Sequence, residues 1–600
     1  MSRVLQVLAP IPRVIDAANA ELLVVDLSAR RSERVPFALT GRRLGGASVA
    51  VEVLEAAIDG PLDPLSADNA IVFAPGPFAG TAVPAATKHA IATVSPLTGR
   101  ITDGLSSSHW SAALRGLGLA ALVVRGACSE WTMLAIDRDG VRFLDAAGLL
   151  GESAAATTVR VRAHLGNQRA RVAAIGLAGE RGVRYATIDN DGRQAGRGGA
   201  GAVMGAKRLK AIALIEGDVE LALADPPRVA ALANSLRERA LGPATAKYRV
   251  LGTGANMRVL QRMGMLPTRN FGAAHFDGVE SVTPERAREN SEAYLERRTG
   301  CVRCPVQCDH MYVRRGADPA RAGAADYESA WAFGPNCGID DLDAVLDAIV
   351  RCDLYGLDTI STGGAIAFAM DCAARGAIDA DAFGTPLRFG NAAVLAPAID
   401  AIARGEGLGA TLGLGVRAAA DAIGIAAADC ALHVKGLELP GYEPRALPTY
   451  ALALAVCTRG ACHNRAAAYD LDLRNPGNVL SDPERAAAVV EAEDIAMAWD
   501  ALVLCKFTRD CFQDFWSEGA ALWTAALGEP LDAEGMRATV RATWHRKRAL
   551  NARLGWTEAE DVLPSRLAEP LRDGSFAGMR SDPEVIERQR RLYERLRAAS

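Results

Sequence analysis

The chain has 600 residues, of which 50% are hydrophobic and 23% charged, as in ordinary globular proteins rather than disordered chains, coiled coils or fibrous repeats. Its 67 basic and 71 acidic side chains give a net charge of −4, so a nucleic-acid-binding surface is not expected. No apolar run reaches the roughly 18 residues that a membrane span needs. Residues 1–20 carry charges and lack the apolar segment of a secretory signal, so we expect a cytoplasmic protein.

Short apolar runs separated by turn residues predict that the first third of the chain is rich in β-strands. These runs lie at residues 21–26, 70–73, 120–124, 132–136, 172–175 and 211–215. A helix is expected near 157–165, and helical periodicity prevails after residue 226, as at 229–240, 342–354 and 483–504. The pattern predicts an α+β fold with a β-rich domain followed by two mainly helical domains. The expected domain boundaries are 1–215, 216–430 and 431–600.

Twelve cysteines in a chain without a secretory signal point to metal binding rather than to a disulfide framework. Cys301, Cys304 and Cys308 lie within eight residues, and Gly300 and Pro305 can bend the chain around a compact group. Three close cysteines and one remote cysteine can hold a [4Fe–4S] cluster. Zinc and buried packing thiols are the alternatives, although zinc more often uses two Cys-x2-Cys pairs. The spacing leaves the fourth ligand open among the other nine cysteines.

A glycine-rich segment at residues 191–210 is the second feature of the sequence. Five glycines lie within ten residues, and Arg193, Arg197, Lys207 and Lys210 add positive charge. Glycine lets backbone N–H groups approach a ligand, and the charges suit phosphate or pyrophosphate. The segment matches neither a Walker loop nor a good Gly-x-Gly-x2-Gly fingerprint. The alternative is a glycine-rich turn between domains with solvated basic side chains.

Together with these two segments, motifs along nearly the whole chain resemble the tungsten-containing aldehyde:ferredoxin oxidoreductase family. The further motifs lie at residues 74–77, 80–81, 95–99, 326–331, 353–362, 434–440 and 459–463. The resemblance implies a β-rich domain that forms a base for the cofactor, covered by two helical domains. It also implies a W or Mo atom held by two pyranopterins, Mg2+ bridging the pterin phosphates, and a [4Fe–4S] cluster close to one pterin.

The resemblance also implies roles for individual residues. The family has two Asp-x2-Gly-Leu-Cys/Asp motifs that bind the pterins; residues 353–358 match fully, whereas residues 500–505 carry Val503 in place of glycine. The second motif makes Cys505 the implied fourth cluster ligand. The implied cofactor contacts are Lys88, Arg193, Gln194, Ala195, Gly196, Arg197, Asp353, Leu357, Asp358, Arg465, Asp500 and Lys506. For the two aspartates that open these motifs, the alternative is a solvated helix face.

Several positions depart from the family pattern. Lys88 stands where an arginine is expected on a pterin phosphate, and lysine keeps the charge but loses bidentate geometry. Leu105 replaces an asparagine near the magnesium site, and Ser107 and Ser108 replace a glycine pair. Asp347 occupies the position of a second family glutamate, and its shorter side chain is expected to disconnect a proton path.

Glu328 and His463 match the family's candidate catalytic residues. Oxidation of an aldehyde to a carboxylate removes two electrons and adds oxygen from water, so one group must polarise the carbonyl and a base must accept protons. Desolvation makes a buried carboxylate more basic, and histidine titrates near neutral pH. Without the resemblance, each side chain has a structural alternative. Glu328 can be a carboxylate at a helix N-terminus, and His463 can be a hydrogen-bonded histidine of the core. Electrons would leave to ferredoxin or to an iron–sulfur or flavin partner subunit.

Two other functions are compatible with the sequence. Related enzymes carry out low-potential reductions of acids or of aromatic rings on CoA thioesters, and Leu105, Ser107 and Asp347 are substrate-side departures that allow this. A degenerate member would serve only as an electron-transfer subunit, which the retained Glu328 and His463 argue against. The sequence has no readable code for the aldehyde or acid substrate, for W against Mo, for the direction and acceptor, or for the oligomeric state.

Overall fold

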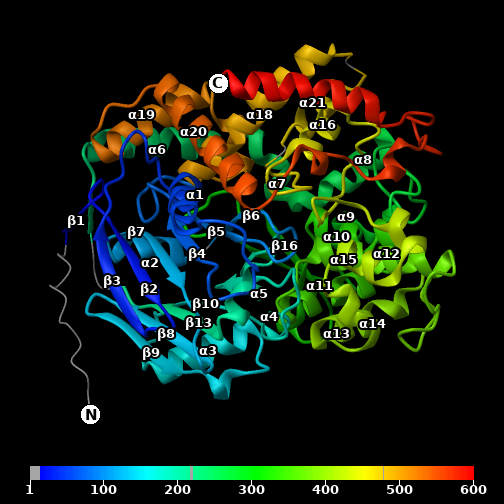
Figure 1. Ribbon diagram of the computed structural model, residues 1–600, viewed down its shortest axis with the longest axis horizontal. Coiled ribbons are helices and arrows are strands. Elements are labelled where there is room, and N and C mark those ends of the chain that lie inside the picture. Colours follow the sequence, from blue (N-terminus) through cyan, green and yellow to red (C-terminus); the bar gives the residue numbers. More distant parts are fainter. Residues whose placement is uncertain (1–13, 108, 217–219, 466, 478) are drawn as a thin grey trace.

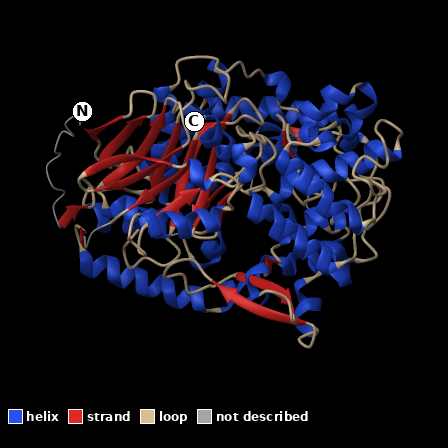
Figure 2. Ribbon diagram, turned by 90° about the horizontal axis from the view of Figure 1, so that it is seen from below, coloured by secondary structure: helices blue, strands red, loops and turns tan. Residues whose placement is uncertain are grey.

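The computed structural model describes residues 14–107, 109–216, 220–465, 467–477 and 479–600. Ser108 lies outside the described residues. So do residues 1–13, which are part of the segment for which no secretory signal is expected. Strands gather on one side of the molecule and helices on the other (Figures 1 and 2). This arrangement confirms the α+β class with a β-rich N-terminal region. In the described ranges, no helix combines the length and the apolar character that crossing a membrane would require.

Two six-stranded sheets make up the β-rich part. The first has the order β3-β2-β7-β4-β5-β6, and only β2 and β7 pair in parallel. Its strands are β2 (Glu21–Asp26), β3 (Arg31–Pro36), β4 (Ile71–Pro75), β5 (Lys88–Val94), β6 (Ile101–Ser107) and β7 (Leu119–Arg125). The register of β5 and β6 pairs Lys88 with Ser107, which brings two of the unusual positions side by side.

The second sheet has the order β12-β11-β10-β13-β8-β9, with β13 and β8 as its parallel pair. Its strands are β8 (Thr132–Asp137), β9 (Gly140–Asp145), β10 (Arg171–Ala174), β11 (Ile188–Asn190), β12 (Arg193–Ala195) and β13 (Leu209–Leu214). Buried side chains of both sheets, such as Phe73, Ile136 and Ile212, form one apolar core together with Trp110. Burial of this shared core is the main force that holds the sheets together.

Helices of the first third are α1 (Gly46–Ala57), α2 (His109–Gly116), α3 (Ala154–His164), α4 (Leu177–Glu180) and α5 (Ala200–Ala206). The predicted helix near 157–165 is α3, but the other four were not predicted. Helix α1 is apolar on several faces, because it packs between the first sheet and two helices of the C-terminal region. A helix that is buried all round shows no amphipathic period, so the usual signal is absent.

The remaining helices form the larger part of the molecule. They are α6 (Pro226–Leu241), α7 (Ala246–Leu251), α8 (Asn256–Met263), α9 (Pro284–Glu289), α10 (Tyr327–Phe333), α11 (Leu342–Tyr355), α12 (Thr359–Ala374), α13 (Leu395–Arg404), α14 (Gly407–Leu412), α15 (Val416–Ile423), α16 (Pro448–Val456), α17 (Tyr469–Arg474), α18 (Asp482–Leu502), α19 (Phe515–Leu527), α20 (Ala533–Arg553) and α21 (Pro583–Ala598). Three of them, α6, α11 and α18, are the helices predicted from periodicity. The largest apolar core joins α10, α11, α12 and α16.

Short strands complete the structure: β1 (Val14–Asp16), β14 (Glu220–Ala222), β15 (Tyr294–Thr299), β16 (Asp309–Arg314), β17 (Gly323–Ala324), β18 (His433–Val434) and β19 (Leu437–Glu438). Helix α6 packs with α19 in the core that covers the first sheet. The same core contains Trp499 of α18, which lies 273 positions after Pro226, the first residue of α6. Segments that are distant in sequence therefore share one core, and the boundaries at 215 and 430 stay predictions.

Candidate active site

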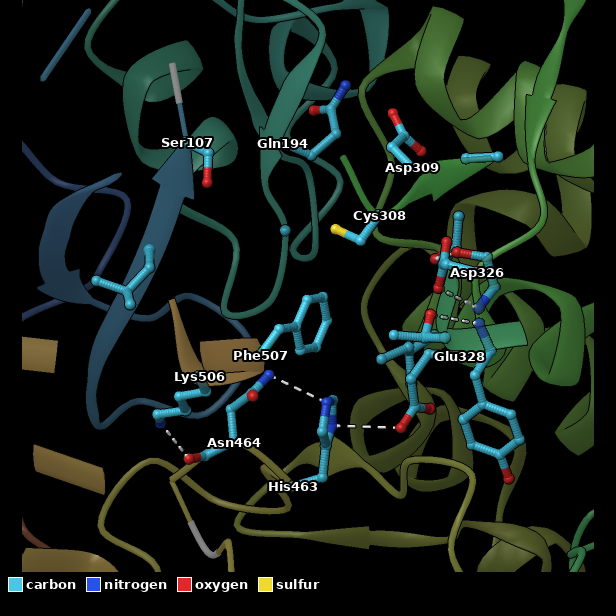
Figure 3. Close-up of a pocket in the computed structure, with 18 of the residues that line it drawn as sticks. Ser107, Gln194, Cys308, Asp309, Asp326, Glu328, His463, Asn464, Lys506 and Phe507 are labelled. Atoms are coloured by element: carbon cyan, nitrogen blue, oxygen red, sulfur yellow. Dashed lines mark hydrogen bonds and ion pairs between the residues drawn. The ribbon is translucent and has the colours of Figure 1, made fainter. Parts of the chain in front are cut away.

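A cavity of about 800 Å³ collects side chains from the sheets and from the helical region. Figure 3 shows part of its lining, with Gln194, Cys308, Glu328, His463 and Lys506 on different segments. Most of the predicted site residues line it: Lys88, Arg193, Gln194, Gly196, Arg197, Cys308, Glu328, Asp353, Leu357, Asp358, His463, Arg465, Asp500, Cys505 and Lys506. The structure thus brings together residues that lie as far apart in the sequence as Lys88 and Lys506. Ala195, Cys301 and Cys304 are not part of the lining.

The triple-cysteine segment forms an irregular loop between β15 and β16. Its backbone is left-handed at Arg303 (φ 55°) and Gln307 (φ 46°), so the loop turns as a cluster motif must. Burial, together with Cys505, raises the pKa of Cys304 to about 11. The pKa of Cys308 is raised by the same two causes, so both thiols lie within electrostatic range of Cys505.

No three histidine, cysteine or acidic side chains of the described residues converge on a single metal-ion position. In a [4Fe–4S] cluster each cysteine binds a different iron, so the thiols surround a volume instead of converging. Cys505 directly follows the C-terminal end of α18, where its backbone N–H donates to the carbonyl of Ala85 at 3.1 Å. This bond anchors the backbone of Cys505, whose thiol lies within electrostatic range of Cys304 and Cys308.

Most glycines of the glycine-rich segment serve protein packing rather than a ligand. A Cβ on Gly201 would lie 2.2 Å from the carbonyl oxygen of Thr187, and one on Gly205 would lie 1.9 Å from that of Gly179. Gly199 has φ 76° and would meet the Arg184 carbonyl at 2.0 Å. Helix α5 can approach the neighbouring backbone only without side chains there. Of the six glycines at residues 191–210, only Gly192 and Gly196 line the cavity.

The two lysines of this segment are also structural, which corrects the expectation that they add charge for a phosphate. Buried Lys207 donates from Nζ to the carbonyls of Asn69 at 2.5 Å and Gly126 at 2.9 Å. Lys210 pairs with Glu180 at 2.5 Å. Neither side chain lines the cavity. Charge in a sequence pattern does not reveal on which face of a segment it lies, and here the face is the protein interior.

The cavity arginines are held in fixed orientations. Arg197 donates to the carbonyls of Ala461 and Glu438, both at 2.6 Å. Arg465 bridges Asp500 at 2.8 Å and Asp103 at 3.0 Å. Charge-assisted contacts of this kind orient a guanidinium but do not use all five of its N–H donors. The rigid cations can therefore face an anionic group in the cavity.

Lys88 differs from these arginines because its ammonium group has no hydrogen-bond or ion-pair partner among the described residues. Burial alone would lower the pKa of Lys88, but the neighbouring Cys505 and Cys301 raise it above its ordinary value. Asp500 acts in the same direction. The ammonium group therefore stays charged, between the cluster cysteines and the cavity.

Asp353 and Asp358 flank the turn between α11 and α12. Gly356 ends α11 with φ 73°, which lets the chain reverse there. Asp358 caps α12 by accepting from Ser361 N at 3.2 Å. Asp353 is exposed only to the cavity and accepts no hydrogen bond from any described residue. Burial, with Asp189 nearby, raises the pKa of Asp353 to about 7.

Val503 is accommodated without entering the cavity. It ends α18 in the left-handed conformation, φ 55° and ψ 35°, where glycine is the ordinary residue. Its side chain occupies space left by two glycines: a Cβ on Gly46 would lie 2.2 Å from Val503 Cγ2, and one on Gly76 would lie 2.8 Å from Val503 Cβ. The departure from the family pattern is therefore met on the protein side.

Glu328 and His463 face each other in the cavity (Figure 3). His463 Nδ1 lies 3.4 Å from Glu328 Oε1, while Glu328 Oε2 accepts from Gly441 N at 2.9 Å. The amide nitrogen of Asn464 lies 3.0 Å from His463 Nε2. An amide N–H can only donate, so the neutral imidazole keeps its proton on Nδ1, toward Glu328.

Burial sets opposite directions for these two groups. It raises the pKa of Glu328 to about 8, although the Gly441 N–H acts the other way. Burial and the charge of Arg197 lower the pKa of His463 to about 3. The expectation that the histidine titrates near neutral pH is wrong, because desolvation and neighbouring cations disfavour imidazolium. Glu328 is the group that changes charge near neutrality.

Asp347 does not line the cavity, which corrects the expectation that it is a substrate-side departure. Its carboxylate pairs with Arg321 and Arg351, each at 2.6 Å, on the outer side of α11. By contrast, Leu105 and Ser107 line the cavity. The sequence positions matched the family, but the helix face could not be read from one chain.

Sequence reasoning missed an aromatic group and several acids of the lining. The aromatic residues come from five segments, so no sequence window shows them together: Tyr248, Tyr327, Tyr442, Tyr469 and Phe507. Asp309 and Asp326 also line the cavity. Asp326 caps α10 by accepting from Ser329 N at 3.1 Å, and this capping position was the available signal.

Two domain models of one family match almost the whole chain. The N-terminal domain of aldehyde ferredoxin oxidoreductase matches residues 22–216, and its domains 2 and 3 match residues 231–597. These matches, together with the β-rich base, the helical cover and the cysteines at the cavity, define the class of the protein as an oxidoreductase. The chain belongs to the aldehyde ferredoxin oxidoreductase family, as the sequence motifs predicted.

Similar proteins carry related names. A tungsten-containing aldehyde ferredoxin oxidoreductase of Pyrococcus furiosus is 34% identical over 562 residues, covering 90% of this chain and 89% of the relative. A P. furiosus aliphatic sulfonate oxidoreductase, WOR-like subunit, is 26% identical over 613 residues, covering 96% and 94%. The active-site complex BamBC of benzoyl coenzyme A reductase with 1,5-dienoyl-CoA has a TM-score of 0.81 at 23% identity, covering 97% of this chain and 95% of that one. That structural likeness shows the shared fold.

Proposed function

We propose that the protein oxidises aldehydes to carboxylates at a tungsten or molybdenum atom held by two pyranopterins. A [4Fe–4S] cluster bound by Cys301, Cys304, Cys308 and Cys505 would pass the electrons to ferredoxin or to an iron–sulfur or flavin partner subunit. Family membership and the name of the P. furiosus relative support this proposal. The observation that carries it is that the Glu328–His463 pair and two of the four proposed cluster ligands, Cys308 and Cys505, line one cavity.

The donor set of the cavity fits such a cofactor. Asp353, whose carboxylate lines the cavity without a hydrogen-bond partner among the described residues, suits the N–H groups of a pterin ring. Asp500, which lines the cavity beside Arg465, is proposed for the second pterin. Lys88, Arg193 and Arg465 suit phosphates. We also propose Mg2+ between the phosphates, near Leu105. Cytoplasmic location is part of the proposal, since cluster cysteines need a reducing compartment.

The bound metallopterin would supply the two-electron acceptor, and water the added oxygen: RCHO + H2O → RCOOH + 2H+ + 2e−. The protein orients the aldehyde and holds protons. Below pH of about 8 Glu328 is protonated and can donate a hydrogen bond to the aldehyde oxygen. When Glu328 is ionised, His463 Nδ1–H faces its Oε1 and stabilises the carboxylate. His463 thus positions Glu328 rather than acting as the base.

The test is aldehyde-dependent reduction of a viologen dye by protein made in a host that supplies both W and Mo. Wild type should reduce the dye, and Glu328→Ala should lose about 100-fold or more of the rate, as expected for a lost acid–base group. A wild-type protein that carries the metal but turns over no aldehyde contradicts the proposal. Assaying reduced viologen with an acid or a CoA thioester tests the alternative low-potential reduction.

A further inference from the structure

Half of the tyrosines in the chain gather beside the Glu328–His463 pair. The chain has ten tyrosines and only 5% aromatic residues in total. Five of the ten belong to this group: Tyr248, Tyr327, Tyr442, Tyr450 and Tyr469. All except Tyr450 line the cavity. The proton chemistry proposed above uses none of these rings, so their concentration calls for another reason.

Two stacked ring pairs form the part of the group that lines the cavity. The rings of Tyr442 and Tyr469 lie 4.5 Å apart at 25°, and those of Tyr248 and Phe507 lie 4.5 Å apart at 18°. The Tyr442 ring is 5.9 Å from the ring of His463. Phe507 also lines the cavity and is drawn with its other lining residues in Figure 3. We call Tyr248, Tyr442, Tyr469 and Phe507 the aromatic wall.

The wall is held rigidly from behind. Tyr450 is fully buried and meets Tyr442 and Tyr469 edge-on, at 5.9 Å each. Tyr327 adjoins Glu328 in sequence and donates its hydroxyl to the carbonyl of Gly441. The N–H of this same glycine holds Glu328, so the aromatic group and the carboxyl share one support.

Tyr442 and Tyr469 stay uncharged at neutral pH. Burial raises the pKa of Tyr469 to about 12, and the pKa of Tyr442 is raised for the same reason. A neutral, planar surface of this kind favours an offset-stacked or edge-to-face ring, with centroids about 4.5–7 Å apart. A saturated ring buries similar apolar area but lacks the π-face that makes these contacts.

We propose that the aromatic wall binds the aryl ring of the substrate, so that the substrates are aryl aldehydes, which are oxidised to arene carboxylates. The inference rests on the proposed function, and its balance is ArCHO + H2O → ArCOOH + 2H+ + 2e−, with both electrons leaving to a one-electron acceptor. Stacking places the ring beside the wall and turns the carbonyl toward Glu328. Ring contacts of this kind are worth about 2- to 13-fold in binding beyond the buried area.

The test compares two aldehydes of similar size, benzaldehyde and cyclohexanecarbaldehyde, by kcat/KM of the holoenzyme with a viologen acceptor. Wild type should prefer benzaldehyde by about 2- to 13-fold. Tyr442→Leu should abolish the preference, whereas Tyr442→Phe should keep it because the ring remains. Tyr469→Leu, at the half-exposed start of α17, repeats the test where the first variant does not fold.

Tyr355→Leu is the matched control, since its hydroxyl binds Asp400 at 3.0 Å outside the cavity and its loss should leave the ratio unchanged. Equal kcat/KM values in wild type overturn the inference, as does a preference that survives in both leucine variants. Calorimetric dissociation constants of benzoate and cyclohexanecarboxylate test the wall without turnover. If no aldehyde is oxidised, the proposed function fails, while tighter benzoate binding that Tyr442→Leu removes still supports the aryl site; equal binding overturns it.

Discussion

Replacing Glu328 by glutamine tests the electrostatics of the site most sharply. Glutamine keeps the shape and can still accept from the N–H of Gly441, but it cannot ionise. In the folded protein the pKa of Glu328 is raised to about 8, from an ordinary 4.5, because the carboxyl is buried. The side chain is only 13% exposed, so solvent does little to reduce the penalty.

The pKa difference is a stability effect through proton linkage. Between the two pKa values the folded state keeps the proton that the unfolded state has lost, so stability falls as pH rises from about 4.5 to about 8. At about 1.36 kcal/mol for each pKa unit, Glu328 costs roughly 3 kcal/mol at pH 7 and roughly 5 kcal/mol above pH 8. At about pH 4 it costs nothing, because both states are protonated.

The assay is calorimetric unfolding of wild type and Glu328→Gln at pH 5, 7 and 9. The variant should gain in unfolding temperature over wild type progressively with pH and reach its largest gain at pH 9. Exposed Glu569 offers a control, and Glu569→Gln should show no such trend. A difference between Glu328→Gln and wild type that is equal at pH 5 and pH 9 refutes a buried, protonated carboxyl. In kinetics, wild-type kcat/KM should fall above pH 8, and the variant should lose that inflection.

Three further changes test other parts of the structure. Cys505→Ser should lower the iron content and the cluster absorption, whereas Cys511→Ser, outside the cavity, should keep both; equal iron in the two variants contradicts the ligand set. Asp353→Asn should reduce the pterin content by roughly 10-fold or more, because the charge-assisted hydrogen bond from a pterin N–H to the carboxylate is lost. Chemical analysis of the pterin content is the measurement. Asp561→Ala should cost about 3–5 kcal/mol in unfolding experiments, because fully buried Lys435, 2.7 Å away, loses its counter-ion; an unchanged unfolding midpoint would contradict this.

The fold was predictable where strands or helices had one dominant pattern. The apolar strands β4 and β7 and the amphipathic helix α11 follow from local sequence. Helix α1 did not, because burial on several faces erases the period. Strands β11 and β12 are three residues each and partly polar, so only their pairing with neighbours makes them strands.

The site was predictable only in part, for a similar reason. Three cysteines within eight residues predict a cluster motif directly. Cys505 lies almost 200 positions away, and its role as the fourth ligand was implied by the resemblance alone. Lys207 and Asp347 show the limit of charge patterns, since one side chain points into the protein and the other to the outer side of α11. Glu328 and His463 could be named from motifs, yet the direction of each pKa shift needed the burial of the folded protein.

The central claim is that this cavity holds a metallopterin beside a [4Fe–4S] cluster. Its most direct measurement is the metal, iron and pterin content of the purified protein from a host that supplies W and Mo. The account predicts one W or Mo atom, two pterins and four irons per chain. Protein that lacks both W and Mo and contains no pterin would contradict it, whatever its iron content.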